Sequence, residues 1–229
     1  MNIVDIICIA FLAISVLYGM YRGFISGILS LLGLIAAIVG AFALSPRLAD
    51  WLKGNDTLVA TLLYYTDAAS RIGNLDLSML SVSQVTGGVL TDILSKAKLP
   101  AAFESAFVGE IGRAASTAKV SSVLSQTIVS ASISILSFLI CFFVCYLAAL
   151  FVVHLISYVF EFPVLRHLDA LIGGLFGALR GYMVLVILFM IVPIVLAAAP
   201  IDAVSNLIAS SKLAPYFDSK LIFSILGIA

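Results

Sequence analysis

The sequence predicts an all-α membrane protein whose chain crosses the bilayer about four times. Of its 229 residues, 63% are hydrophobic and only 10% are charged, whereas soluble domains carry about 25% charged residues. Three stretches, residues 23–46, 120–160 and 181–201, contain no Asp, Glu, Lys or Arg. Uncharged apolar runs of about 18 residues or more predict transmembrane helices, because a helix satisfies its backbone hydrogen bonds internally where lipid offers none.

The first two predicted spans are residues 3–21 and 24–44. The first is long enough to cross most of a ~30 Å hydrocarbon core at ~1.5 Å per residue. The second should end at Ser45-Pro46, because proline cannot continue the helical hydrogen-bond ladder. Only Arg22 and Gly23 separate the two spans, so we expect them to form a tight helical hairpin.

Residues 47–119 differ from the apolar spans that flank them. They hold seven basic and seven acidic side chains, scattered singly, while apolar residues such as Val85, Val89 and Ile93 recur every four positions. This periodicity predicts short amphipathic helices that lie at the membrane surface or on the membrane bundle. A substrate-binding domain is the alternative, although ~70 residues of modest apolar content rarely form a core of their own.

The third predicted span, residues 133–158, occupies only part of an uncharged run. A helix along the whole of 120–160 would measure ~60 Å, about twice the thickness of the hydrocarbon core. Seven serines gather in residues 121–137, at the beginning of that run. Serine permits close helix packing, so we expect this beginning to lie at the interface or in a seam between helices.

Residues 168–199 allow two interpretations that differ in where they place Arg180. A single helix would bring this arginine near the bilayer midplane, at a cost of ~2.5–3.5 kcal/mol on insertion scales. We therefore predict a re-entrant or interfacial half-helix at 168–179, followed by a fourth span at 182–199. After Pro200, the segment 201–229 is predicted to form amphipathic, interfacial structure.

A short motif, Gly-x-x-Arg-Gly-aromatic, occurs twice, as "GMYRGF" at 19–24 and "GALRGY" at 177–182. Glycines four residues apart let helix backbones approach closely. The arginine at the hairpin tip could instead pair with Asp5 or Asp169, cap carbonyls or bind lipid phosphate. The candidate residues for packing or charge pairing are Asp5, Gly19, Arg22, Gly23, Phe24, Asp169, Gly173, Gly177, Arg180, Gly181 and Tyr182.

These motifs and their surroundings resemble the colicin V production protein (CvpA) family. In that family an aspartate begins the first helix and a Gly-x-x-Arg-Gly-Phe hairpin follows, as in "VDIICIAFLAISVLYGMYRGF" here. A later acidic, glycine-rich, Arg-Gly element is matched by residues 169–181, and "SSKLAPYF" is similar to the family's Ser-x-Leu-x-Pro segment. The resemblance implies a bacterial inner-membrane protein linked to peptide toxin production or export and to envelope stress tolerance.

The composition argues against several other classes of protein. Twelve basic and twelve acidic residues give no net charge, which does not favour nucleic acid as a partner. Cys8, Cys141 and Cys145 lie in apolar runs and are expected to pack rather than to pair or bind metal. No sequence motif of a hydrolase, nucleotide-binding or zinc enzyme occurs, so we predict no catalytic, cofactor or metal site.

Two functional hypotheses remain open. In the first, the chain is an accessory or scaffold protein that acts through export or envelope proteins. In the second, it is an oligomeric channel or small transporter with Asp5, Arg22, Asp169 and Arg180 along the path; since one copy has few helices, this requires a homo-oligomer. Both place the chain in the lipid bilayer of the inner membrane.

Overall fold

The computed structural model describes residues 2–66, 78–85, 87–97, 101–159, 166–198, 206–208, 210–217, 222–223 and 226. These residues are predominantly helical, and within them no strand forms beyond an isolated bridge between Ser81 and Lys119. The all-α prediction is therefore confirmed. The elements are α1 (Ile3–Lys53), α2 (Asp56–Thr66), η1 (Val82–Gln84), α5 (Gly87–Ala97), α6 (Ala101–Arg113), α7 (Val120–Val159), α8 (Arg166–Phe189), α9 (Ile191–Ala198) and η2 (Ala214–Phe217).

The chain divides into two compact units, to which α1 and α7 both contribute. The sequence predicts a single membrane domain over residues 1–229, and this stays a prediction. The first unit comprises Met1–Pro46, Ser137–Met190 and Asp202–Ser219, and the second comprises Arg47–Leu136, Ile191–Ile201 and Lys220–Ala229.

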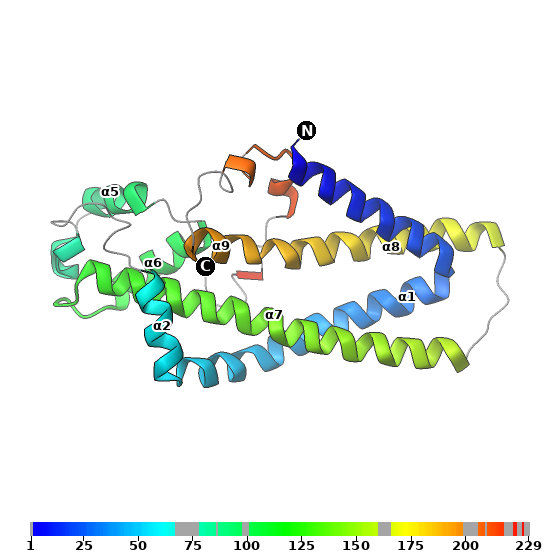
Figure 1. Ribbon diagram of the computed structural model, residues 1–229, viewed down its shortest axis with the longest axis horizontal. Coiled ribbons are helices and arrows are strands. Elements are labelled where there is room, and N and C mark those ends of the chain that lie inside the picture. Colours follow the sequence, from blue (N-terminus) through cyan, green and yellow to red (C-terminus); the bar gives the residue numbers. More distant parts are fainter. Residues whose placement is uncertain are drawn as a thin grey trace. The chain divides into compact units, whose positions relative to one another are not determined.

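Three apolar segments of the described chain are long enough to cross a membrane: Ile3–Lys53, Val120–Leu155 and Ala170–Leu196. The first of them changes direction sharply within the first unit, so α1 consists of two arms (Figure 1). The reversal occurs at Gly23, whose φ of 79° and ψ of 178° are non-helical. Only glycine adopts this region readily. The predicted hairpin at Arg22-Gly23 is therefore confirmed.

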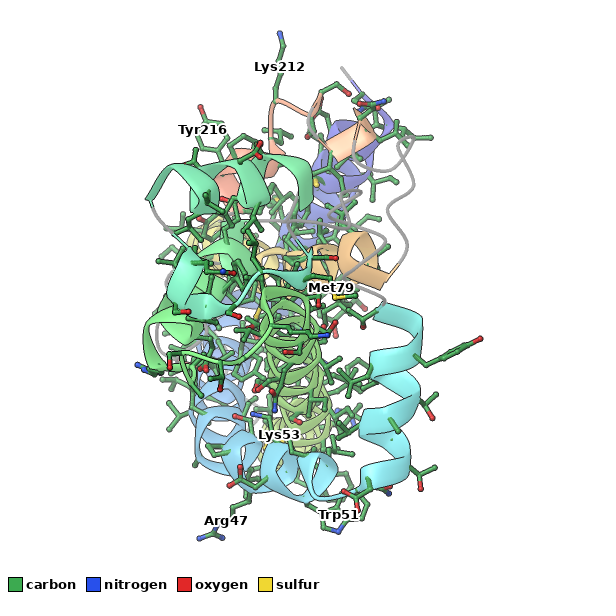
Figure 2. The ribbon with its side chains drawn as sticks, turned by 90° about the vertical axis from the view of Figure 1, so that its left-hand side faces the viewer. Arg47, Trp51, Lys53, Met79, Lys212 and Tyr216 are labelled. Carbon is green, nitrogen blue, oxygen red and sulfur yellow. The ribbon has the colours of Figure 1, made fainter. Side chains whose placement is uncertain are left out.

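The second arm of α1 does not end at Ser45-Pro46, so the predicted end of that span is wrong. The helix continues through Pro46 to Lys53. Packing explains the continuation, because Ala49 and Leu52 belong to a buried cluster of the second unit around Val129. Burial of these side chains outweighs the loss of one hydrogen bond at proline. Arg47 and Trp51 point outward from this last part of α1 (Figure 2).

Helix α8 runs unbroken from Arg166 to Phe189, so the predicted half-helix at 168–179 with a separate span at 182–199 is wrong. The helix breaks at Met190 instead, where the backbone N–H bonds to the carbonyl of Ile187 at 3.1 Å. Pro193 explains this position, since it has no N–H for the carbonyl of residue 189 and its ring crowds that carbonyl.

In the first unit, the second arm of α1 packs along α7 over small residues. A Cβ on Gly33 would lie 3.1 Å from Val153, and one on Gly40 would lie 3.1 Å from the Cys145 sulfur. This supports the packing role expected for that cysteine. In the second unit, the core is made of bulky side chains from α5, α6 and α7. Its fully buried members include Ile93, Phe103, Phe107, Val120, Leu124 and Ile128.

The amphipathic segment 47–119 thus contributes α2, α5 and α6 to a compact unit with a core. Helix α7 begins at Val120, well before the span predicted at 133–158. Its 40 residues correspond to ~60 Å, and its first part belongs to the second unit. The C-terminal prediction, residues 201–229, falls largely outside the described residues; η2 and its neighbours belong to the first unit.

Candidate functional site: the two glycine–arginine motifs

The glycines of the two motifs meet in the first unit and bring the first arm of α1 against α8. A Cβ added to Gly173 would lie 2.5 Å from the Gly19 carbonyl oxygen and 2.9 Å from the Gly23 carbonyl carbon. One added to Gly177 would lie 3.1 Å from the Gly19 Cα. As residue numbers rise along α1 they fall along α8, so the helices are antiparallel. Their backbones are in direct contact, as small residues at intervals of four permit.

Ser15 extends this contact and was missed by the sequence analysis. Its hydroxyl donates a 2.7 Å hydrogen bond to the Gly177 carbonyl, and a Cβ on Gly181 would lie 2.8 Å from its side chain. A signal was present, because Ser15 precedes Gly19 by four positions and serine is nearly as small as glycine. We call Ser15, Gly19, Gly23, Gly173, Gly177 and Gly181 the small-residue seam.

The two motif arginines converge on one aromatic ring. The Tyr18 ring centroid lies 5.1 Å from the Arg22 Cζ and 5.8 Å from the Arg180 Cζ. Arg180 also donates to the Tyr146 hydroxyl, from Nε at 3.1 Å and from one terminal nitrogen, and stands 5.8 Å from that ring. We call Tyr18, Arg22, Tyr146 and Arg180 the arginine–tyrosine cluster. The sequence analysis named neither tyrosine; Tyr18, four residues before Arg22, was the detectable one.

Asp5 is nearly fully buried, and its hydrogen-bond partners are backbone and serine groups rather than an arginine. Its carboxylate accepts hydrogen bonds from the backbone N–H of Asn2 at 2.9 Å, the Ser211 hydroxyl at 2.6 Å and the backbone N–H of Leu213 at 3.1 Å. It therefore ties the beginning of α1 to the segment before η2. Pairing with Arg22 is excluded by distance, since 17 residues of helix measure ~25 Å.

The side chain of Asp169 lies outside the described residues. Its backbone belongs to α8, eleven positions before Arg180, which is a separation of ~16 Å along a helix. This separation is too long for an ion pair. Neither aspartate therefore neutralises the arginine of its own motif, and the charge pairing considered for the sequence does not form within either helix.

The aromatic residue of each motif packs outside the seam. The Phe24 ring lies 5.8 Å from that of Phe176 on α8. Tyr182 donates a 2.9 Å hydrogen bond to the carbonyl of Tyr216, and its ring lies 5.5 Å from Phe217 in η2. Phe217 forms a buried cluster with Cys8 and Leu185. The second motif thus anchors η2 to α8.

A cavity of about 640 Å³ lies in the second unit. One wall is a polar stripe on α7, at intervals of four residues, and the other walls include Lys53, Ala106 of α6 and Glu110. The serine-rich beginning of α7 thus lines open space in addition to any helix contact. Within the described residues, no three His, Cys, Asp or Glu side chains gather as metal ligands would. The stripe consists of Ser122, Gln126, Ser130 and Ser134.

Comparison with known proteins identifies the family. No curated protein and no solved structure matches the chain. The family model described as colicin V production protein matches residues 4–107 and 105–221. These ranges include both motifs, the arginine–tyrosine cluster and the Ser211 segment that holds Asp5. The chain is therefore a helical membrane protein that belongs to the colicin V production protein family.

Proposed function

We propose that this protein is a non-enzymatic accessory protein of the bacterial inner membrane that supports the production or export of a peptide toxin such as colicin V. It acts as a scaffold for export or envelope proteins and contributes to envelope homeostasis in that capacity. Family membership supports the link to toxin production, and the three long apolar segments support the membrane location.

The small-residue seam is the observation that favours a scaffold over a channel. Gly19, Gly173 and Gly177 contact one another backbone to backbone, which leaves no width for a solute between α1 and α8. Asp5 is held by Ser211 and Leu213, whereas Arg22 and Arg180 contact Tyr18. Among the described side chains, Asp5 and the two arginines therefore do not form a continuous line of charges such as an ion path requires.

Toxin release from cells tests the proposal directly. A colicin V-producing strain that lacks this protein should release little active toxin, and expression of the wild-type chain should restore release. Gly19→Leu should fail to restore it, because the new side chain separates α1 from α8. Gly109→Leu is the matched control, since nothing lies within 4 Å of a Cβ at that position. Immunoblots of membrane fractions check that both variants are present. Normal release without the protein would overturn the proposal.

Flux through purified protein separates the scaffold from a channel. In liposomes loaded with a potassium-sensitive dye, the wild-type protein should pass no more potassium than empty liposomes. Extraction into nanodiscs followed by mass spectrometry should then identify a stoichiometric foreign protein. A potassium flux that Arg22→Gln or Arg180→Gln abolishes would instead establish an oligomeric channel with a charged path.

A further inference from the structure

We infer that the arginine–tyrosine cluster is a binding site for the phosphate group of an anionic phospholipid. This site does not depend on the proposed function, because a scaffold and a channel could both hold a lipid there. It is built from two segments of α1 and α8 that carry the repeated motif, together with one tyrosine of α7.

The cluster carries two positive charges, and none of the side chains described around it is negatively charged. Arg22 and Arg180 are both half-buried, and within the described part of the chain neither forms an ion pair. The Tyr18 and Tyr146 rings attract the guanidinium groups but leave their charge unchanged. Two like charges that share one ring in a partly dehydrated site repel each other. An anion at the site removes this repulsion, which is a reason for one to bind.

The hydrogen-bond donors of the cluster match a phosphate. Each guanidinium has five N–H donors in a planar fork that suits two oxygens of one phosphate. Arg180 directs Nε and one terminal nitrogen to Tyr146, which fixes its orientation and leaves further donors. Among the described residues, the Arg22 guanidinium donates no hydrogen bond to a protein acceptor. Charge-assisted, two-pronged contacts of this type are strong and specific.

Exposed apolar side chains close to the cluster residues in sequence favour a lipid over free phosphate. Leu17 precedes Tyr18 and is 64% exposed, Leu179 precedes Arg180 and is 48% exposed, and Phe143 lies one turn before Tyr146 and is 63% exposed. A ligand with a phosphate and hydrocarbon chains satisfies both surfaces. Arg22 also stands at the corner between two membrane-spanning arms, where long basic side chains reach the headgroup region.

Among the side chains that the structure describes, no carboxylate lies near the cluster, which favours an anionic headgroup. Phosphatidylcholine is zwitterionic, and its ammonium group would be stabilised by an acidic side chain beside the site. Asp5 is engaged by Ser211 and Leu213 and lies ~25 Å along α1 from Arg22. Phosphatidylglycerol, which carries a phosphate and no ammonium, is therefore the expected ligand.

Native mass spectrometry of the full chain in detergent micelles tests the site. The delipidated protein is titrated with phosphatidylglycerol or phosphatidylcholine, and lipid-bound species are counted. We expect one phosphatidylglycerol to bind at least roughly tenfold more tightly than phosphatidylcholine. Arg22→Gln and Arg180→Gln should each weaken that binding roughly fivefold, as is typical of one basic residue at an anionic membrane surface.

Arg47→Gln is the matched control, because Arg47 is exposed and points away from α1 (Figure 2). It should change phosphatidylglycerol binding less than twofold. Equal affinity for the two lipids, or an equal loss in Arg47→Gln and Arg22→Gln, would overturn the inference. If 10 mM inorganic phosphate displaces the lipid completely, free phosphate is the ligand and the lipid assignment is wrong.

Lysine variants keep the test informative if a glutamine variant does not fold. Arg22→Lys and Arg180→Lys retain the charge and lose the planar fork. Both should retain a preference for phosphatidylglycerol and bind it two- to threefold more weakly than wild type. Unchanged binding in both lysine variants would show that phosphate binding does not need the planar guanidinium fork. That result would overturn the geometry inferred for the site.

Discussion

The α1–α8 contact of the first unit and the core of the second unit pack in opposite ways. In the first unit, α1 and α8 meet where side chains are missing, so that a Cβ on Gly173 would lie 2.5 Å from a carbonyl oxygen of the neighbouring helix. In the second unit, Phe103 and Phe107 fill the core and are fully buried, while Gly109 and Gly112 have nothing within 4 Å of a Cβ position. Glycine therefore forms a packing surface between α1 and α8, whereas in α6 it makes no close contact.

The difference follows from what drives helices together in each setting. Between membrane-spanning helices the hydrophobic effect gives little attraction, because lipid tails are as apolar as side chains. Close backbone approach and hydrogen bonds such as Ser15 to Gly177 supply the attraction instead. In the second unit, large apolar side chains fill the core, and their close packing stabilises it. The α1–α8 contact should therefore be sensitive to substitutions of glycine that α6 tolerates.

The largest expected effect is in the core of the second unit. Phe107→Ala should destabilise that unit by about 3–5 kcal/mol, because it removes a fully buried ring and leaves a cavity. Hydrogen exchange of the detergent-solubilised protein should show faster exchange in α6 than in wild type. Phe143→Ala, which removes a 63% exposed ring from α7, should leave α6 protected. Loss of protection only in α8 after Phe107→Ala would contradict the assignment of Phe107 to the core of the second unit.

A smaller effect, but with opposite signs in the two units, is expected for glycine. Gly177→Ala should destabilise the contact of α1 with α8 by about 3 kcal/mol, because the methyl group meets backbone rather than a side chain that can move. Gly109→Ala should stabilise α6 by about 0.5–1 kcal/mol through helix propensity. Thermal unfolding in micelles measures both. Equal shifts of the two unfolding midpoints in the same direction would show that Gly177 and Gly109 do not differ in their packing role.

The smallest effect is expected at the cavity. Ala106→Leu places three more carbon atoms beside open space and should change stability by less than about 0.5 kcal/mol. Ala41→Leu makes the same substitution at a fully buried position of the first unit and should cost about 1–3 kcal/mol. Unfolding midpoints of the two variants, compared side by side, measure how much free space each unit has. A loss above 2 kcal/mol for Ala106→Leu would show that the cavity is filled.

The sequence by itself determined the helical membrane class, because the composition of a helix indicates whether lipid or water surrounds it. It also determined the reversal at Gly23, since two apolar spans with only Arg22 and Gly23 between them leave no other connection. The intervals of four between Gly173, Gly177 and Gly181 indicated close packing before the partner helix was known. In each case the signal is local, because spacing and residue type within one helix carry it.

The tertiary structure alone decided where charges and helix ends lie. Arg180 remains inside an unbroken α8 because Tyr146, 34 positions away, accepts its hydrogen bonds. Asp5 is satisfied by Ser211, 206 positions away, and α1 passes Pro46 because Ala49 packs near Val129. A rule based on local sequence assigns an energetic cost to an arginine or a proline in isolation. The free energy of folding depends instead on partners that only the fold brings within reach.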